Sequence, residues 1–297
     1  MNTSLIVGAV VALVLIAAIV IATRPRHAED RGAVELLPEG ETAGDAVSLE
    51  PVHETQRRVE LMRDISAARW IDERLVPWRR EGVYVGSVVP QGFEAYVRIL
   101  HPAGRKPEAG GTRVRWSTIA SWTGRVVHPE MQFDRIAALR TWNDDPGWDY
   151  PPQEGLLPRE DCERLASLLR PHTSTPEVCW FCIWEGFGGY FDAKRYRGVP
   201  RVTTPGRSYV LYRGPLDAVT AFHWDWIWQS PNLWWPDDRA WCVATEIDLP
   251  ETYVGGSQAC IERILADDQL EAIQTRIDAR VDFDADTLNP PTGVTPD

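Results

Sequence analysis

The sequence has little positive charge and almost no lysine. Its 31 lysine and arginine residues are outnumbered by 43 aspartate and glutamate residues, which gives a net charge of −12, and its lysines are Lys106 and Lys194 alone. A nucleic-acid partner requires a basic patch that neutralises phosphates. The acidic balance therefore excludes nucleic acid as a partner.

Cysteine is scarce too, and its spacing argues against the usual cysteine sites. Five cysteines in 297 residues are too few for a disulfide scaffold. Cys179 and Cys182 match C-x-x-C, but the surrounding segment 178–184 is rich in β-branched and aromatic residues and predicts a strand. Residues three apart in a strand face opposite sides, with Cα atoms about 10 Å apart. No second C-x-x-C or H-x-x-x-H completes a zinc site. We therefore expect two separate buried thiols.

Motifs for cofactor binding and catalysis are missing as well. The glycines after Trp184 fail the dinucleotide pattern G-x-G-x-x-G because Phe191 takes the last position. The acidic run from Asp282 resembles only the start of a calcium loop, because Thr287 and Gly293 stand where glycine and glutamate are needed. No pair among the six histidines has metal-ligand spacing, and no G-x-S-x-G motif accompanies them. The sequence thus predicts no cofactor and no metal.

The N-terminus holds a long apolar run. Residues 5–22 contain no charged or polar side chain and cover about 27 Å as a helix, roughly the thickness of a bilayer core. This predicts a single-pass transmembrane helix, with a cleaved signal peptide as the alternative. The positive-inside rule places the following domain in the cytoplasm, because arginines follow the run and none precedes it. The predicted partner is the lipid bilayer, and small residues such as Gly8 and Ala12 leave a homodimer open.

The rest of the chain predicts one mixed domain. We expect a short tail (1–4), the transmembrane helix (5–22), a flexible acidic linker (23–54), a tryptophan-rich α+β domain (55–281) and a loose C-terminal tail (282–297). Apolar spacing and capping residues predict helices at 55–76, 116–122, 132–139, 157–170 and 258–266. Aromatic and β-branched runs predict strands at 83–89, 178–184, 208–212, 222–228 and 241–247. Because these elements follow no regular βαβ repeat, the predicted fold class is α+β.

The 14 tryptophans point to a large aromatic surface, either in the core or along a binding site. Phe222, Trp224, Trp226 and Trp228 alternate with other residues, so a strand would place all four on one face, which we assign to the core. The next segment contains Trp234, Trp235, Asp237, Asp238 and Arg239, and its proline and aspartates predict a loop with partly exposed tryptophans. A fully buried segment is the alternative.

Two regions therefore supply the candidate binding residues. Glu185, beside Trp184 at the end of a predicted strand, is the best acidic candidate. The complete set is Trp184, Glu185, Trp234, Trp235, Asp238 and Arg239.

Three stretches resemble a family of uncharacterised actinobacterial proteins. They read FEAYVRILHPA, HTSTPEVCWFCIWEGFG and LWWPDDRAWCVATEIDLPETYVGG, and with their spacing they span 93–270. This resemblance to a conserved protein family of unknown function implies a shared fold unit without an established activity. It also implies that the second cysteine of the C-x-x-C is not a fixed feature. The last stretch is weakly similar to bacterial immunity-type domains.

The function predicted from these observations is that of a membrane-anchored, non-catalytic binding module. One alternative is an enzyme of unassigned reaction that uses Glu185 with His172 or His223 in an aromatic pocket. A second alternative is an envelope-facing carbohydrate-binding domain, which the tryptophan content favours. Convergence of Glu185, Trp234 and Arg239 in one cleft would support a single site.

Overall fold

The centre of the fold is a large antiparallel sheet. The computed structural model describes residues 58–78, 82–106, 111–137, 147–187, 196–224 and 227–289, all of which fall within one compact unit, 50–297. In these ranges nine strands pair in the order β1-β7-β5-β10-β11-β12-β2-β13, with β6 also paired to β7. Every one of these pairings is antiparallel.

The strands of this sheet are mostly short. Their bounds are β1 (Glu60–Leu61), β2 (Ala95–Leu100), β5 (Cys179–Trp184), β6 (Val202–Thr204), β7 (Arg207–Gly214), β10 (Leu233–Pro236), β11 (Cys242–Thr245), β12 (Glu251–Gly256) and β13 (Ala272–Thr275). Two small ribbons pair β3 (Ala103–Gly104) with β4 (Arg113–Val114), and β8 (His223–Trp224) with β9 (Ile227–Trp228).

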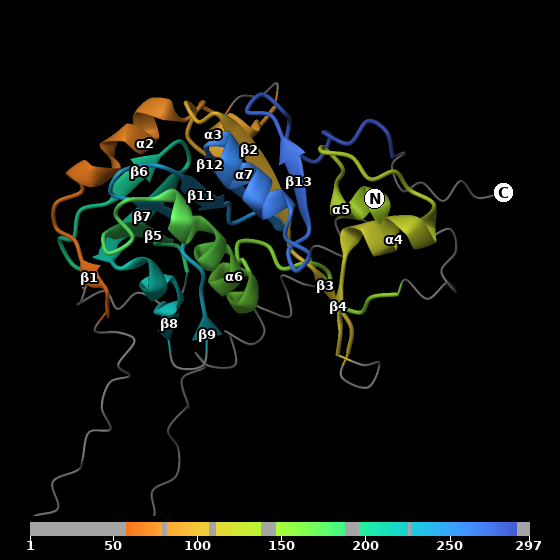
Figure 1. The fold of residues 1–297 in the computed structure, drawn as a ribbon, viewed down its shortest axis with the longest axis horizontal. Helices are drawn as coiled ribbons and strands as arrows, with labels where there is room; N and C mark the ends of the chain where they lie inside the picture. Colours follow the sequence, from red (N-terminus) through yellow and green to blue (C-terminus); the bar gives the residue numbers. More distant parts are fainter. Residues whose placement is uncertain are drawn as a thin grey trace, which may run out of the picture. The chain divides into compact units, whose positions relative to one another are not determined.

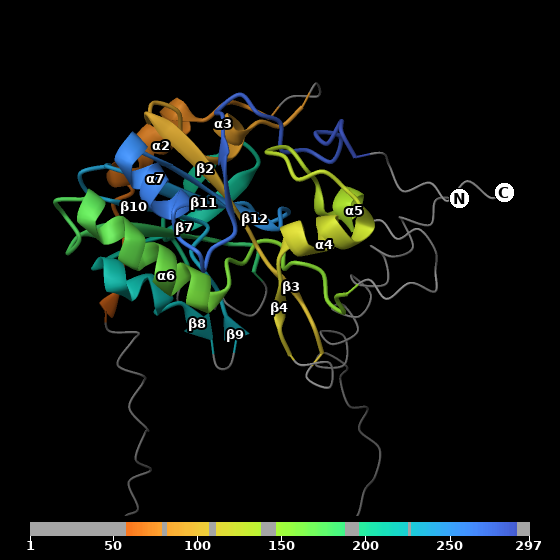
Figure 2. The same cartoon turned by 45° about the vertical axis from the view of Figure 1, so that its right-hand side comes forward.

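Helices cover both faces of the sheet. One face packs against α6 (Arg159–Leu169), α7 (Gln258–Leu265) and the 3₁₀ helix η5 (Leu216–Thr220), which lie together in Figures 1 and 2. The other face packs against η2 (Ser66–Ala68), α2 (Arg69–Arg74) and α3 (Val85–Val88). The helices α4 (Trp116–Thr123) and α5 (Phe133–Ile136) surround a third apolar cluster beside β2 and β13. A further 3₁₀ helix, η4 (Arg170–His172), follows α6 directly.

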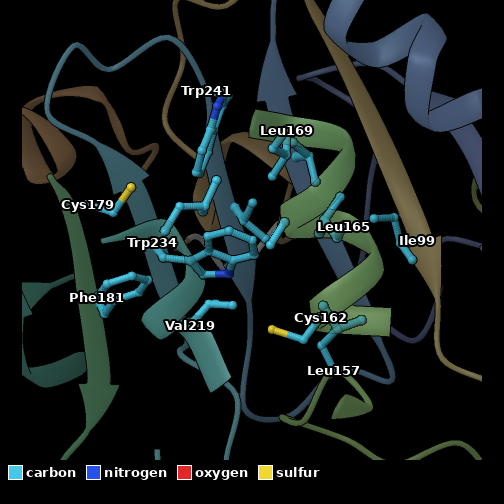
Figure 3. Packing of buried hydrophobic residues seen from close by; sticks show 14 of the residues in the cluster. Ile99, Leu157, Cys162, Leu165, Leu169, Cys179, Phe181, Val219, Trp234 and Trp241 are labelled. Carbon is cyan, nitrogen blue, oxygen red and sulfur yellow. The ribbon is translucent and has the colours of Figure 1, made fainter. Parts of the chain in front are cut away.

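Alternation along the central strands separates the two main cores. In Figure 3, Trp234 of β10 lies in the first core, between Leu165 and Leu169 of α6 and Phe181 of β5. Its neighbour Trp235 belongs to the opposite core. Burying side chains of this size on both faces removes several hundred Å² of apolar surface from water, which is the main term that stabilises such a fold.

The C-x-x-C cysteines follow the same alternation. Cys179 belongs to the first core and Cys182 to the second, and both are buried free thiols. The predicted strand is present as β5, and the prediction that the two sulfurs face opposite sides is confirmed. Because side chains alternate with a period of two residues along a strand, two cysteines three positions apart face opposite sides, which rules out a disulfide between them.

Several helices with clear local signals are also confirmed. The strongest is α6, where Glu160 and Asp161 occupy the first turn and the apolar residues predicted from the spacing are buried. Ser257 caps α7, since its hydroxyl accepts a hydrogen bond from the backbone N–H of Cys260. Gly124, in the left-handed region at φ 69°, ends α4. The first-turn acids of α6 and the capping residues of α7 and α4 act within a few positions in the chain, so the sequence alone reveals these elements.

Other predicted elements are wrong. The segment 83–89 is not a strand but contains α3, whose backbone N–H groups at Val85 and Gly86 bond to carbonyls of Ala279 and Ile277. The long helix predicted at 55–76 is broken into β1, η2 and α2. The strand predicted at 222–228 is instead the β8–β9 ribbon. Phe222 is buried in the first core and Trp228 packs against the same core, whereas the side chains of Trp224 and Trp226 lie outside the described parts of the structure. In the first two cases hydrogen bonds to distant segments override the local pattern.

The predicted fold class also needs correction. The described residues form a mixed α+β domain with a large antiparallel sheet, but no helix among them is long and apolar enough to cross a membrane. The longest, α6, has 11 residues, which span only about 16 Å against a bilayer core of about 30 Å. The predicted transmembrane helix (5–22) and linker (23–54) lie outside the described ranges. The location derived from that helix stays a prediction.

The segment predicted as a loose tail is partly fixed. Asp286 and Asn289 are buried, and the side chain of Asn289 bonds to both the N–H and the carbonyl of Val126. Asp286 accepts hydrogen bonds from His128 at 2.8 Å and from the N–H of Asn289 at 2.9 Å. Residues up to 289 therefore belong to the domain, and those from 290 onward lie outside the described residues.

Candidate binding surfaces

The six predicted site residues do not converge in one cleft. Trp184 ends β5 and Glu185 follows it, whereas Asp238 and Arg239 follow β10, whose last residue pairs with Cys179 at the start of β5. The N–H of Asp237 bonds to the carbonyl of Val178, which places this turn at the start of β5. Five residue steps of about 3.3 Å put the two ends about 17 Å apart. The structure thus holds two separate candidate regions.

Trp234 and Trp235 are core residues and not loop residues. They are 0% and 1% exposed, and they lie in β10, which is paired on both edges by β5 and β11. Trp234 packs edge-on against Trp241 with ring centroids 5.3 Å apart. The prediction of partly exposed loop tryptophans is therefore wrong. Pro236 stands at the last strand position, where a missing N–H is tolerated, so the proline did not mark a loop at this point.

Asp238 has a structural role. Its carboxylate accepts hydrogen bonds from the Thr173 hydroxyl at 2.9 Å and from the N–H and hydroxyl of Ser174 at 2.6 and 2.8 Å. Partial burial opposes ionisation, but these bonds and that from the N–H of Ala240 outweigh it and hold the pKa of Asp238 below its usual value. The residue ties the turn after β10 to the loop before β5, so it shapes this end of the sheet.

Arg239 lies in the turn that Asp238 fixes, and it has an unusual backbone. It is the one non-glycine residue at positive φ, 56°, among the described residues. A side chain in the left-handed region costs about 1–2 kcal/mol. Its guanidinium carbon lies 5.5 Å from the ring centroid of Trp70, a residue of α2, and that of Arg74 lies 5.6 Å from the same ring. Two arginines therefore stack on one buried indole.

This arrangement continues across the sheet. Trp70 packs edge-on against Trp235 with centroids 5.9 Å apart, and Trp235 pairs in register with Trp180 of β5. Arg213 of β7 is opposite Trp180 and lies 5.9 Å from its ring. We name this set the arginine–tryptophan row; it comprises Arg74, Trp70, Arg239, Trp235, Trp180 and Arg213.

The charges in the row are not neutralised locally. Arg74 and Arg239 are exposed and make no ion pair with any described residue, although arginines elsewhere pair often, as Arg207 does with Glu246. The indole N–H of Trp70 is buried and has no acceptor within the described parts of the chain. A buried donor without an acceptor costs about 1–3 kcal/mol. Two arginines without an ion-pair partner among the described residues thus lie over one indole ring.

The second region is a shallow hollow at the other end of β5. It has a volume of about 430 Å³ and is bounded by the end of β5 and by the β6–β7 hairpin. Its lining comprises Trp184, Glu185, Gly186, Thr203, Thr204, Gly206, Arg207 and Ser208. We name it the Trp184 hollow. Two of the six predicted residues therefore do share a concave surface.

The structure separates one of the two pairs in the predicted enzyme alternative, Glu185 with His172, while the pair of Glu185 with His223 stays a prediction. Glu185 is ion-paired with Arg201, whose Nε lies 2.7 Å from its carboxylate. His172 precedes Thr173, which contacts Asp238 at the opposite end of β5. Within the described ranges, no group of three or more histidine, cysteine, aspartate or glutamate side chains is arranged to hold a metal ion. Glu185 and His172 are therefore too far apart to act on one substrate.

Several residues of the row were missed by sequence reasoning. Trp70 and Arg74 lie in a segment that was interpreted as one long helix, although their i, i+4 spacing on α2 is itself the signal for a stacked pair. Trp180 and Arg213 meet only through strand pairing, which no local pattern reveals.

Comparisons of the chain with protein-family models, with curated proteins and with solved structures find no match. The resemblance to the uncharacterised actinobacterial family therefore stays a prediction.

Proposed function

We propose that the chain is a non-catalytic binding module that recognises an anionic group, a carboxylate or a phosphate, on the arginine–tryptophan row. The single observation that carries this proposal is the pair of arginines on Trp70. Arg74 and Arg239 stack on the same indole and make no ion pair among the described residues, in a chain whose net charge of −12 offers an excess of carboxylates.

The stacking geometry favours anion recognition. A guanidinium that lies on an aromatic ring uses its flat face there and keeps its N–H edge free to donate. That edge matches the two oxygens of a carboxylate or phosphate in a bidentate hydrogen bond. Because the ring already restrains both side chains, less conformational entropy is lost when the anion binds.

The surrounding acids do not compete for these arginines. Asp238 is bonded to Thr173 and Ser174, and Asp237 accepts a hydrogen bond from the indole N–H of Trp180 at 3.0 Å. The backbone at Arg239 also favours a role for its side chain. Glycine would remove the strain at this positive φ, yet the position holds arginine. Strained residues of this kind concentrate at ligand-binding positions, where the side chain is needed.

The test is a titration of the chain with pyrophosphate and with citrate at low ionic strength, followed by calorimetry and tryptophan fluorescence. We expect at least one of them to bind saturably and to bind more weakly as salt is added. Arg74→Ala and Arg239→Ala should each weaken binding by about tenfold or more, because each removes charged hydrogen bonds.

The matched control is Arg263→Ala. Arg263 is an exposed arginine in the last turn of α7, which packs on the opposite face of the sheet. This variant should bind as the wild type does. The proposal fails if neither anion binds, or if Arg263→Ala weakens binding as much as Arg239→Ala.

A further inference from the structure

A further pocket lies beside the start of α4. Its volume of about 310 Å³ falls in the range of about 300–1,000 Å³ that is usual for small-ligand sites. Its lining comprises Leu100, Pro102, Arg113, Arg115, Gln269 and Glu271. We name it the Arg115 pocket. It shares no residue with the arginine–tryptophan row, so an inference about its ligand goes beyond the anion-binding function and does not depend on it.

One wall of the pocket is a face of the β3–β4 ribbon, which leads directly into α4 (Figures 1 and 2). Val114 pairs with Ala103, and both are buried in the third apolar cluster. Because side chains alternate along an extended segment, Arg113 and Arg115 face away from that cluster, with Cα atoms about 7 Å apart. Pro102, next to Ala103, faces the same way. The two arginines and the proline therefore share one side of the ribbon, and all three line the pocket.

The two arginines differ in their partners. Arg113 pairs with Asp161 and, at 3.5 Å, with Glu160 in the first turn of α6. Arg115 makes no ion pair with any described residue, and one of its Nη atoms donates to the backbone carbonyl of Asp268. A guanidinium has five N–H donors, so this bond leaves most of them for a ligand. Arg115 is therefore the group in the pocket that is suited to a carboxylate, which it can bind through two parallel hydrogen bonds.

The opposite charge in the pocket comes from Glu271. Its two carboxylate oxygens accept hydrogen bonds from the backbone N–H groups of Trp116 and Ser117, both at 2.7 Å. These bonds fix the carboxylate at the first turn of α4, directly after Arg115 in the chain. Each carboxylate oxygen can accept a second hydrogen bond, so Glu271 keeps acceptor capacity for a ligand. The pocket thus holds a donor and an acceptor of opposite charge close together.

A ligand that carries a single charge fits this pocket poorly. A simple carboxylate would be attracted by Arg115 and repelled by Glu271, and a simple amine would meet the reverse. A ligand that carries both charges on neighbouring atoms pairs with each group and leaves no charge without a partner. Pro102 and the buried Leu100 add apolar surface, and the amide of Gln269 can donate and accept.

We propose that the Arg115 pocket binds a free α-amino acid with an apolar side chain. The carboxylate of the ligand accepts hydrogen bonds from Arg115, and its ammonium group donates to Glu271. Its side chain lies against Pro102 and Leu100, which removes apolar surface from water.

The experiment titrates the full chain with L-leucine, followed by calorimetry. Leucine should bind saturably. Two analogues of the same shape test the charges, because 4-methylpentanoate lacks the ammonium group and 3-methylbutylamine lacks the carboxylate. Each analogue should bind more weakly than leucine by about tenfold or more, since each loses a pair of charged hydrogen bonds.

Two variants assign the charges to residues. Arg115→Gln and Glu271→Gln should each weaken leucine binding by about tenfold or more. Glu271→Gln should bind 4-methylpentanoate more tightly than the wild type does, because the repulsion of its carboxylate is removed. If Glu271 served only to hold the start of α4, its loss would weaken all three ligands alike.

The matched control is Arg63→Gln. Arg63 is an exposed arginine between β1 and η2, and β1 lies at the edge of the sheet opposite to β13. This variant should bind leucine as the wild type does. The proposal is overturned if leucine does not bind, if 4-methylpentanoate binds as tightly as leucine, or if Arg115→Gln binds leucine normally while folded by circular dichroism. Anion binding at the row is measured separately with pyrophosphate and citrate, so either function can fail alone.

Discussion

At the scale of single residues, Arg239 combines a costly backbone conformation with a side chain that lies over Trp70. Arg239→Gly and Arg239→Ala both remove the guanidinium from Trp70, but only glycine also removes the β-carbon that is strained at φ 56°. We expect the glycine variant to be more stable than the alanine variant by about 1 kcal/mol in urea denaturation. Equal stability of the two variants would show that the turn carries no strain.

Each of the two tryptophans of β10 should also have a large effect on the free energy of unfolding. Trp234 and Trp235 are almost fully buried on opposite faces of the sheet. Truncation of either to alanine should lower the free energy of unfolding by about 3–5 kcal/mol, through lost burial and the cavity left behind. Trp122→Ala, at an exposed site, should cost much less. A mild effect of Trp235→Ala in a thermal melt would show that burial of this ring contributes little to stability.

At the scale of secondary-structure elements, a buried ion pair joins the sheet to the α4–α5 cluster. Arg98 of β2 donates to Glu251 of β12 at 2.9 Å and to the carbonyls of Pro129 and Met131 at 2.8 Å, and it lies 5.4 Å from the ring of Trp116. Both charged side chains are 0–1% exposed. The pair therefore connects two strands and the loop between α4 and α5 in one contact.

Breaking this pair should be costly. Glu251→Gln leaves the Arg98 charge uncompensated, so we expect a loss of about 3–5 kcal/mol in denaturant unfolding. The double variant Arg98→Met, Glu251→Leu should recover much of that loss, because it removes both desolvated charges. If Glu251→Gln unfolds at the same denaturant concentration as the wild type, the pair does not stabilise this junction.

His101, just after β2, should make stability depend on pH. Its Nδ1 donates to the carbonyl of Gln153 at 2.7 Å and its Nε2 lies 2.9 Å from the Thr252 hydroxyl. Burial lowers the pKa of His101 from its usual 6.5 to about 4, against the opposing effect of the Gln153 hydrogen bond. Between those two values the unfolded chain binds a proton that the folded chain does not, so stability falls as the pH falls.

The size of this effect can be measured against a variant. A pKa difference of this kind corresponds to about 3 kcal/mol in the free energy of unfolding. This stability is fully present above pH 6.5 and is lost as the pH falls toward 4. Urea denaturation of the wild type and of His101→Gln at several pH values isolates it, because other titrating groups are common to both proteins. The variant should lose less stability between pH 7 and pH 4.5. Parallel pH curves would exclude His101 as the cause.

At the scale of the whole molecule, the cysteines report on global unfolding. All five are buried and free. Burial raises the pKa of Cys179 and Cys260 to about 12 and raises the pKa of the other three thiols as well. Native protein should therefore resist iodoacetamide, and denatured protein should gain five labels by mass spectrometry. Rapid labelling of any one thiol in the native state would reveal local opening there.

The sequence by itself determined the features that act over a few residues. The cap of α7 by Ser257, the end of α4 at Gly124 and the opposite faces of Cys179 and Cys182 could all be derived from spacing and side-chain chemistry. It also yielded the class of a mixed α+β domain. Such features can be read from the sequence because they depend on residues within one helical turn or one strand.

Only the tertiary structure decided which distant segments meet. Strand pairing buried Trp235, brought Arg213 of β7 to Trp180 of β5, and placed α2 where Trp70 contacts Arg239. It also separated Glu185 from Arg239, whose convergence in one cleft would have indicated a single site. The register of an antiparallel sheet is set by the summed burial of both faces and not by any one segment. The arginine–tryptophan row comes from four separate segments, so it becomes visible only once the sheet is formed.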